Sequence, residues 1–444
     1  MRDFLNTYIE TQKEEMLKDL ADFVAIPSVS EDIEKVREAL EFVLHLGEKM
    51  GFRTEKCLDG QVGVIEMGDG DETLGILAHV DVVPAGDSAD WDSNPFTAII
   101  KDGKVYGRGT IDDKGMIIAS LYAMKAAVEY GQPLRKKVQL ILGTQEEVEW
   151  TDMNAYVKAY PLPDYGFSPD GEYPICNIEK GVADCNMEFN VTDSVEAEGG
   201  YITAIQCGVA QNSVPGRAVA TLSNGETVTV DGRSVHACQP EDGINALFLL
   251  CDKLQEKQVA KTKLMELLEQ VTVSFRDMYG KAIGMYSESE FYEGEFVHRN
   301  VFTPTIFRAE NGIAKININL RFPYGVGEED LLAAMTTFAE SQGGRITLWD
   351  YLPAVFVSKE RPFLKVLEEA YEAVTGMKNE YTLAYGGSYA KAMPNVVSWG
   401  PLFPGEEDTC HEVNEYISIK SLMDSAKIFA QSIAGIALTE ESLK

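Results

Sequence analysis

The sequence has few of the basic residues through which proteins bind anionic membranes or nucleic acids. It contains 39 lysine and arginine residues against 71 acidic residues, which gives a formal net charge of -32. Nucleic acids and anionic membrane surfaces attract positive charge, so neither is expected to bind this chain. No apolar run approaches the roughly 20 residues of a membrane span, and residues 1–5 lead into charged residues rather than the apolar core of a signal peptide. The acidic balance does favour an active site that attracts cations.

Cysteine is scarce and phosphate-binding motifs are missing. There are seven cysteines, an odd number, and no pair has the C-x-x-C spacing. This pattern predicts reduced thiols rather than a disulfide framework, and we therefore expect a cytoplasmic protein. The chain also has no G-x-G-x-x-G and no P-loop, so a phosphate cradle is not expected.

What remains is the composition of a large globular protein. The 444 residues are 45% hydrophobic and 25% charged, which predicts two or three domains with an ample core. From about residue 60 to residue 180, strand patterns alternate with helical ones. The predicted strands are Val62–Met67, Leu74–Ala78 and Val138–Leu142, and the predicted helix is Lys114–Glu129. Such alternation is typical of a layered α/β domain.

The pattern changes near residue 180. Short strands with two helices follow, which indicates an α+β insertion, and from about residue 354 the chain returns to helix and strand in turn. The sequence therefore predicts one α/β domain of residues 1–180 and 354–444, with helices around a mostly parallel sheet. An α+β domain of residues 181–353 interrupts it.

Polar residues follow two of the predicted strands directly. His79 comes after Leu74–Ala78, and Glu146 and Glu147 come shortly after Val138–Leu142. Ligands of open α/β sheets bind outside the carboxyl ends of the strands. Imidazole and carboxylate groups are ligands of zinc and similar cations, and two-metal hydrolases need several of them. The sequence therefore predicts a metal centre at this edge.

Each of these residues alone permits a plainer interpretation. Adjacent acids such as Glu146 and Glu147 are common on surfaces, and the run 107–115 with Asp112 also fits a glycine turn with an acidic helix cap. In a metal site the two glutamates would divide the work, one binding metal and the other taking a proton from water. Of the other histidines, we expect a structural role for His45 in a helix and a solvated or loop role for His298.

A series of motifs spans nearly the whole chain in a fixed order. They are His79-Val80-Asp81-Val82-Val83-Pro84, Trp91-Asp92-Ser93-Asn94-Pro95-Phe96, Gly107-Arg108-Gly109-Thr110, Asp112-Asp113-Lys114-Gly115, Gly143-Thr144-Gln145-Glu146-Glu147, Pro169-Asp170-Gly171-Glu172-Tyr173-Pro174, Glu179-Lys180-Gly181, Met393-Pro394-Asn395, Phe403-Pro404-Gly405 and His411-Glu412-Val413-Asn414-Glu415. Together they resemble the M20 family of metallopeptidases and, within it, the dipeptidase V group, which includes β-alanyl and Xaa-His dipeptidases. The α/β part would then be a metallopeptidase catalytic domain and the insertion its lid.

The resemblance implies a site for two divalent metal ions. His79, Asp112 and Asp170 would hold one ion. Asp112, Glu147 and His411 would hold the other, so that Asp112 bridges the pair. Zinc suits such ligands best, and manganese or cobalt suits them too.

The resemblance also implies the residues that act on the substrate. Glu146 would be the general base that activates the bridging water, and Asp81 would orient His79. In the insertion, His236 would stabilise the oxyanion of the tetrahedral intermediate, and Asn212 would assist it. Arg321 would grip the C-terminal carboxylate of the substrate through its guanidinium fork.

The chain departs from the family pattern in two segments. Gln145 and Val148 flank the glutamate pair where the family usually has aspartate and a small polar residue. Lys391 replaces an arginine, although Gly387 and Ser388 near it retain donors for a substrate carboxylate. Such changes are expected to shift substrate preference.

The sequence thus predicts a dinuclear metal-dependent dipeptidase, in which metal-bound hydroxide attacks dipeptides with a free C-terminal carboxylate. The alternatives are a deacylase of N-acyl amino acids with the same chemistry, and a non-catalytic relative that keeps the fold. The insertion of about 170 residues resembles lids that complete the site within one chain, so we expect a monomer.

Overall fold

The computed structural model describes residues 1–192 and 200–444, which form two compact units. Unit 1 comprises residues 1–178, 355–382 and 388–444, and unit 2 comprises residues 179–354 and 383–387. The short segment 383–387 therefore groups with unit 2, although we expected the whole of residues 354–444 in the catalytic part. Among the described residues, no helix combines the length and apolar character needed to span a bilayer.

Unit 1 is built around a nine-stranded sheet whose central strands are parallel. In spatial order the strands are β1 (Arg53–Cys57), β2 (Val62–Met67), β6 (Lys137–Gly143), β3 (Thr73–His79), β7 (Tyr165–Ser168), β21 (Val396–Ser398), β9 (Cys176–Glu179) and β19 (Val355–Phe356), with β20 (Thr382–Ala384) paired to β9. Neighbours from β6 to β21 run parallel, β1 and β2 are antiparallel to the strands beside them, and β9 is antiparallel to β21. β3 and β6 are almost entirely buried, which is usual for parallel strands covered on both faces.

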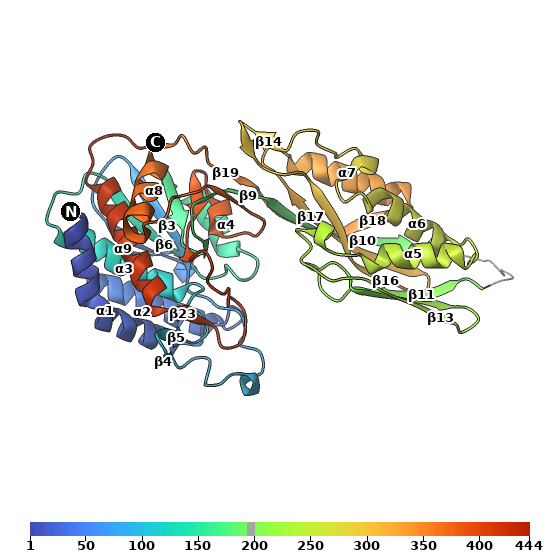
Figure 1. Ribbon diagram of the computed structural model, residues 1–444, viewed down its shortest axis with the longest axis horizontal. Coiled ribbons are helices and arrows are strands. Elements are labelled where there is room, and N and C mark those ends of the chain that lie inside the picture. Colours follow the sequence, from blue (N-terminus) through green and yellow to red (C-terminus); the bar gives the residue numbers. More distant parts are fainter. Residues whose placement is uncertain (193–199) are drawn as a thin grey trace. The chain divides into compact units, whose positions relative to one another are not determined.

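Helices cover this sheet. They are α1 (Arg2–Val24), α2 (Ile33–Lys49), α3 (Lys114–Glu129), α4 (Thr151–Ala159), α8 (Pro362–Thr375) and α9 (Ile419–Ala437). α3 and α9 pack side by side with α1 and α8 next to them (Figure 1), and both touch β3. α3 is buried on nearly every side, so its sequence lacks the polar stripe of a surface helix. Short strands complete the unit: β4 (Ile99–Lys101), β5 (Lys104–Tyr106) and β23 (Tyr416–Ser418) in one sheet, and β8 (Gly171–Glu172) and β22 (Pro401–Leu402) in another.

Unit 2 is an antiparallel sheet with helices on it (Figure 1). In spatial order its strands are β13 (Thr227–Asp231), β12 (Arg217–Leu222), β11 (Ile202–Cys207), β16 (Val301–Glu310), β17 (Ile313–Phe322), β10 (Gly181–Asn190) and β18 (Gly344–Leu352). Its helices are α5 (Ala246–Glu256), α6 (Lys263–Phe275) and α7 (Glu328–Ser341), and a small hairpin joins β14 (Phe291–Tyr292) to β15 (Glu295–Phe296). The alternating burial of β10 shows that every second side chain enters the core. The expected fold class, an α/β part with an α+β insertion, is confirmed.

Candidate metal centre and substrate-binding residues

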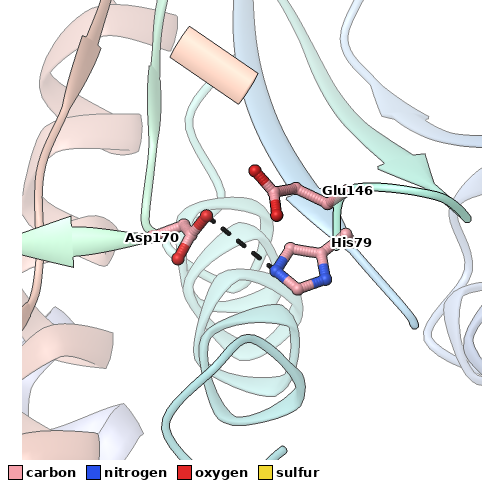
Figure 2. Close-up of side chains that lie close together, drawn as sticks. All are labelled: His79, Glu146 and Asp170. Atoms are coloured by element: carbon pink, nitrogen blue, oxygen red, sulfur yellow. Dashed lines mark ion pairs between the residues drawn. The ribbon is translucent and has the colours of Figure 1, made fainter. Parts of the chain in front are cut away.

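Three candidate metal-site residues lie at or just after the ends of neighbouring parallel strands of unit 1. His79 ends β3 directly opposite Gly143, which ends β6, and Glu146 comes three residues later. On the other side of β3, strand β7 ends at Ser168, two residues before Asp170. Parallel strands end at the same edge of a sheet. The imidazole of His79 and the carboxylates of Glu146 and Asp170 accordingly point toward one another (Figure 2).

The candidate ligand atoms lie within coordination reach of common points. His79 Nε2 lies 2.9 Å from Asp112 Oδ1 and 3.9 Å from Asp170 Oδ2. One atom each of His79, Glu146 and Asp170 lie within 4.8 Å of one another, and the same holds for His79, Asp112 and Glu147. Two overlapping groups of nitrogen and oxygen donors therefore share His79.

His411 joins the second of these groups from a loop far away in the sequence. Its Nε2 lies 3.0 Å from Asp112 Oδ2 and 3.1 Å from Glu147 Oε1. The side chain is 54% exposed, whereas that of His79 is 1% exposed. The structure thus brings together all five predicted metal ligands, and Glu146 lies beside them.

The cluster is strongly anionic. Burial and repulsion by the Asp170 carboxylate raise the pKa of Glu146 well above its usual value. Burial and repulsion by Asp112 raise the pKa of Asp170 to about 8. Contacts with the carboxylates of Asp112 and Glu147 raise the pKa of His411 to about 11. Packing so many carboxylates in a buried place favours positive charge among them, and a divalent cation supplies it.

Two buried atoms of the cluster support binding of a cation directly. His79 Nε2 and Asp112 Oδ1 are buried and lie 2.9 Å apart, yet neither has a well-aligned hydrogen-bond partner among the described residues. Buried polar atoms normally have a hydrogen-bond partner, and a cation coordinated by the two side chains would satisfy them instead. Their donor set, imidazole with carboxylates, is the one that zinc and manganese prefer. The residues present therefore fit the metals that the sequence predicts.

Asp81 contacts the backbone of Glu146 and Glu147 in addition to the ring of His79. Its carboxylate accepts the backbone N–H groups of Glu146 at 3.2 Å and Glu147 at 3.3 Å, together with the hydroxyl of Ser30 at 2.8 Å. His79 Nδ1 lies nearer to the backbone carbonyl of Asp81, at 3.0 Å, than to its carboxylate, at 3.4 Å. Because Nδ1 faces this carbonyl, it carries the proton and leaves Nε2 to face the cluster.

Two buried carboxylates that the sequence analysis did not assign hold the loops of the site. Asp152 accepts the backbone N–H groups of Thr144 and Gln145, just before the glutamate pair. Glu415 accepts those of Ile111 at 3.0 Å and of Asp112 at 3.4 Å. Glu415 belongs to one of the motifs quoted above, but no sequence signal marks Asp152.

His236 lies in unit 2, on an exposed segment after β13 that pairs with the segment of Asn212. The backbone carbonyl of Asn212 accepts the N–H of Ala237 at 2.8 Å. His236 Nδ1 accepts the backbone N–H of Cys238 at 3.2 Å. An acceptor at Nδ1 places the proton of the neutral ring on Nε2. Partial desolvation and the charge of Arg321 lower the pKa of His236, which favours the neutral ring.

Arg321 lies on β17 of unit 2 and is 7% exposed. Its Nε donates to Asn319 Oδ1 at 3.0 Å, and its Nη1 donates to the backbone carbonyl of Tyr385 at 2.8 Å. Both partners are neutral. Tyr385 belongs to the segment 383–387, so this hydrogen bond joins that segment to β17 within unit 2.

The structure places the remaining two predicted residues, Gly387 and Ser388, one on each side of the division between the units. Gly387 is exposed, and the buried Ser388 accepts the backbone N–H of Ala390 at the start of a short 3-10 turn. The catalytic, substrate-binding and ligand roles of all these residues stay predictions.

Comparison with known proteins supports the family resemblance that the sequence motifs indicate. The model of peptidase family M20/M25/M40 matches residues 75–435. A putative dipeptidase of Bacillus subtilis, YtjP, is 34% identical over 464 residues, which cover 96% of this chain and 98% of the relative.

Solved structures show a similar fold at low identity. The aminoacylhistidine dipeptidase of Vibrio alginolyticus is 15% identical with a TM-score of 0.66, over 96% of this chain and 97% of its own. YXEP of Bacillus subtilis, described as a dinuclear metal-binding peptidase of the M20 family, is 11% identical with a TM-score of 0.58, over 96% and 99%. The family match spans most of the chain, including every candidate metal ligand, and the chain therefore belongs to peptidase family M20/M25/M40.

Proposed function

We propose that this protein is a dinuclear metal-dependent dipeptidase that hydrolyses dipeptides with a free C-terminal carboxylate. The observation that carries this proposal is the cluster of His79, Asp112, Glu147, Asp170 and His411 around the carboxylate of Glu146. Membership of the family and the putative dipeptidases among the relatives support it.

His79, Asp112 and Asp170 would hold one ion, and Asp112, Glu147 and His411 the other. We propose zinc, because imidazole and carboxylate oxygen are its usual ligands in hydrolytic sites. When bound, such ions lower the pKa of water and polarise the scissile carbonyl.

Glu146 is the residue in position to move the proton. Its carboxylate lies beside those of the ligands, and its backbone N–H is fixed by Asp81. Burial raises its pKa, which suits a group that takes a proton from water and then gives it to the leaving amine.

Most of the substrate contacts that we propose come from residues of unit 2, and Ser388 belongs to unit 1. With its proton on Nε2, His236 can donate to the carbonyl oxygen as negative charge develops there. Arg321 would bind the C-terminal carboxylate, since a guanidinium pairs with a carboxylate through two parallel hydrogen bonds. Asn212 and the donors of Gly387 and Ser388 would add to these contacts.

We propose further that the chain acts as a monomer in the cytoplasm. Its seven cysteines are free thiols, six of them buried, which suits a reducing compartment. Light scattering coupled to size-exclusion chromatography measures the mass directly, and a value of twice 49.0 kDa would exclude the monomer.

Hydrolysis of a small substrate panel tests the proposed activity. Metal-free protein is reloaded with zinc or manganese and offered Ala-Ala, Leu-Leu, β-Ala-His, a tripeptide, N-acetyl-methionine and N-succinyl-diaminopimelate. We expect metal-dependent cleavage of the dipeptides only. Cleavage of the N-acyl compounds alone would overturn the proposal in favour of a deacylase, and no turnover with either metal would count against an enzyme.

A further inference from the structure

Arg321 is a buried cation without a carboxylate partner. It is 7% exposed, and no described carboxylate forms an ion pair with it. Its two hydrogen bonds to Asn319 and Tyr385 leave three of the five guanidinium N–H groups without a partner among residues 1–192 and 200–444. Burying an unpaired charge is unfavourable, so an anion from outside the chain is expected to meet these donors.

The side chains beside Arg321 form a row across two strands. Asn317, Asn319 and Arg321 occupy every second position of β17, and Asp184 and Asn186 do the same on β10. In the antiparallel register Asp184 lies directly opposite Asn319, and Asn186 lies opposite Asn317. Alternate residues of a strand share one face, so the row lies on a single face of the sheet.

Hydrogen bonds within this row fix the direction of each amide. The amide nitrogen of Asn319 donates to both carboxylate oxygens of Asp184, at 3.2 and 3.3 Å. The carbonyl oxygen of Asn319 is therefore turned toward Arg321, and it accepts the Nε–H at 3.0 Å. Because Asp184 accepts hydrogen bonds only, it cannot hold Asn319 in the flipped orientation.

The row also explains why Asp184 does not neutralise Arg321. Asn317 donates to Asp184 as well, at 3.3 Å, so two amides occupy the carboxylate. Asn319, which is 1% exposed, separates the two opposite charges. The guanidinium is thus oriented by neutral contacts on Nε and one Nη1 proton, while Nη2 stays available.

We propose that Asp184 and Asn319 are positioning residues that aim the guanidinium of Arg321 at the C-terminal carboxylate of the substrate. They thereby set the preference for a free carboxylate over an amide. This inference rests on the proposed function, in which Arg321 binds that carboxylate. It extends the function by naming the residues that keep Arg321 unpaired and correctly turned.

Kinetics with Ala-Ala and with its C-terminal amide test the role of both residues. In Asp184→Asn and Asn319→Leu we expect KM for Ala-Ala to rise about 10-fold, because a hydrogen bond to a charged group loses its alignment. The kcat should stay within about 2-fold, and kcat/KM for the amide should not change, since the amide lacks the charge that Arg321 binds. Lys315→Met is the matched control, because Lys315 lies on the same strand and face as Asn319 but is 69% exposed, and it should behave like the parent.

A binding measurement on the same metal-loaded proteins separates this inference from the proposed activity. Calorimetry measures the Kd of the reduced dipeptide Ala-ψ(CH2NH)-Ala and of its amide, neither of which can be hydrolysed. We expect Asp184→Asn to weaken binding of the acid alone. If Asn319→Leu fails to fold, the isosteric Asp184→Asn still decides the matter.

Three results would overturn the inference. They are equal losses for acid and amide, a fall in kcat with KM unchanged, and unchanged Kd values in both variants. A parent enzyme that binds the reduced acid in preference to its amide, yet cleaves no dipeptide, would instead refute the proposed activity and leave the positioning role supported by the Kd values.

Discussion

Arg108 and Glu415 form a buried ion pair with 2.7 Å between Nη1 and Oε2, and both side chains are at most 2% exposed. Glu415 also accepts the backbone N–H of Asp112, and Arg108 Nη2 donates to the backbone carbonyl of His411 at 3.3 Å. One ion pair therefore ties together the two loops that carry Asp112 and His411. Removing one partner of a buried pair leaves the other charge uncompensated, so we expect loss of the pair to disturb both loops.

Glu415→Gln is accordingly expected to weaken metal binding. The amide nitrogen of glutamine would face N–H groups that now donate to a carboxylate, and the loop of Asp112 would shift. Changes to residues that hold metal ligands typically reduce affinity 10–100-fold, and we expect a loss of about 10-fold or more here. Competition with a chelator measures the affinity, and Glu407→Gln, at an exposed glutamate eight residues earlier in the chain, serves as control. Equal affinities in parent and Glu415→Gln would contradict this role.

Glu146→Gln should separate catalysis from metal binding. Glutamine keeps the shape of the side chain but cannot accept a proton, so we expect kcat to fall by about 1,000-fold. Metal content, measured by mass spectrometry of the purified protein, should stay at the parent value. The exposed Glu149→Gln controls for loss of a negative charge on the same loop. Turnover near the parent rate in Glu146→Gln would remove it from the role of base.

The bounds of strands and helices could be predicted well from the sequence, because they depend on local residue patterns. The predicted strand Val62–Met67 and the predicted helix Lys114–Glu129 have the bounds that the structure shows. The position of His79 at a strand end needed only the apolar run before it. Its meeting with Glu146 followed from the rule that ligands bind at the carboxyl ends of the strands, whereas Asp170 was expected only from the family resemblance.

Contacts that depend on the tertiary fold could not be predicted in this way. Asp152 reads as one more acid in a polar segment, yet it is fully buried and holds the backbone of Thr144. His298 lies in a loop, as one part of the expectation had it, but it is half-buried rather than solvated, and its Nδ1 lies 3.1 Å from the buried Lys180. The hydrophobic periodicity of a sequence cannot reveal such contacts, because they are set by the tertiary fold.

His236→Ala is expected to lower kcat more than it raises KM. If Nε2–H donates to the oxyanion, its loss removes an interaction that strengthens only in the transition state, and we expect a fall in kcat of about 100-fold. Steady-state kinetics with Ala-Ala measure both constants. His45→Ala removes another exposed histidine, from helix α2, and should leave them unchanged. A higher KM with the parent kcat would indicate ground-state binding instead.

Lys114 introduces a pH dependence into the stability of unit 1. Its side chain is fully buried, and Nζ donates to the backbone carbonyls of Phe23 at 3.2 Å and Ile26 at 2.7 Å, at the end of α1. Burial lowers the pKa of Lys114 to about 7, although Glu415 and Asp81 oppose the shift. The unfolded chain, with the usual lysine pKa near 10.4, binds a proton that the folded protein releases between these two values. Stability of the parent therefore rises as pH increases from 7 toward 10.

Lys114→Met should abolish this rise. By linkage, the free energy of unfolding of the parent relative to Lys114→Met should increase by about 2 kcal/mol between pH 7 and pH 9. Urea unfolding of the metal-free proteins at both pH values measures it. Any loss from the unpaired carbonyls of Phe23 and Ile26 is the same at both and cancels in the comparison. Lys125→Met, on the same helix but partly exposed, should follow the parent. A difference between parent and Lys114→Met that does not change with pH would show that Lys114 stays charged in the folded protein, with the helix-end carbonyls stabilising its ammonium group.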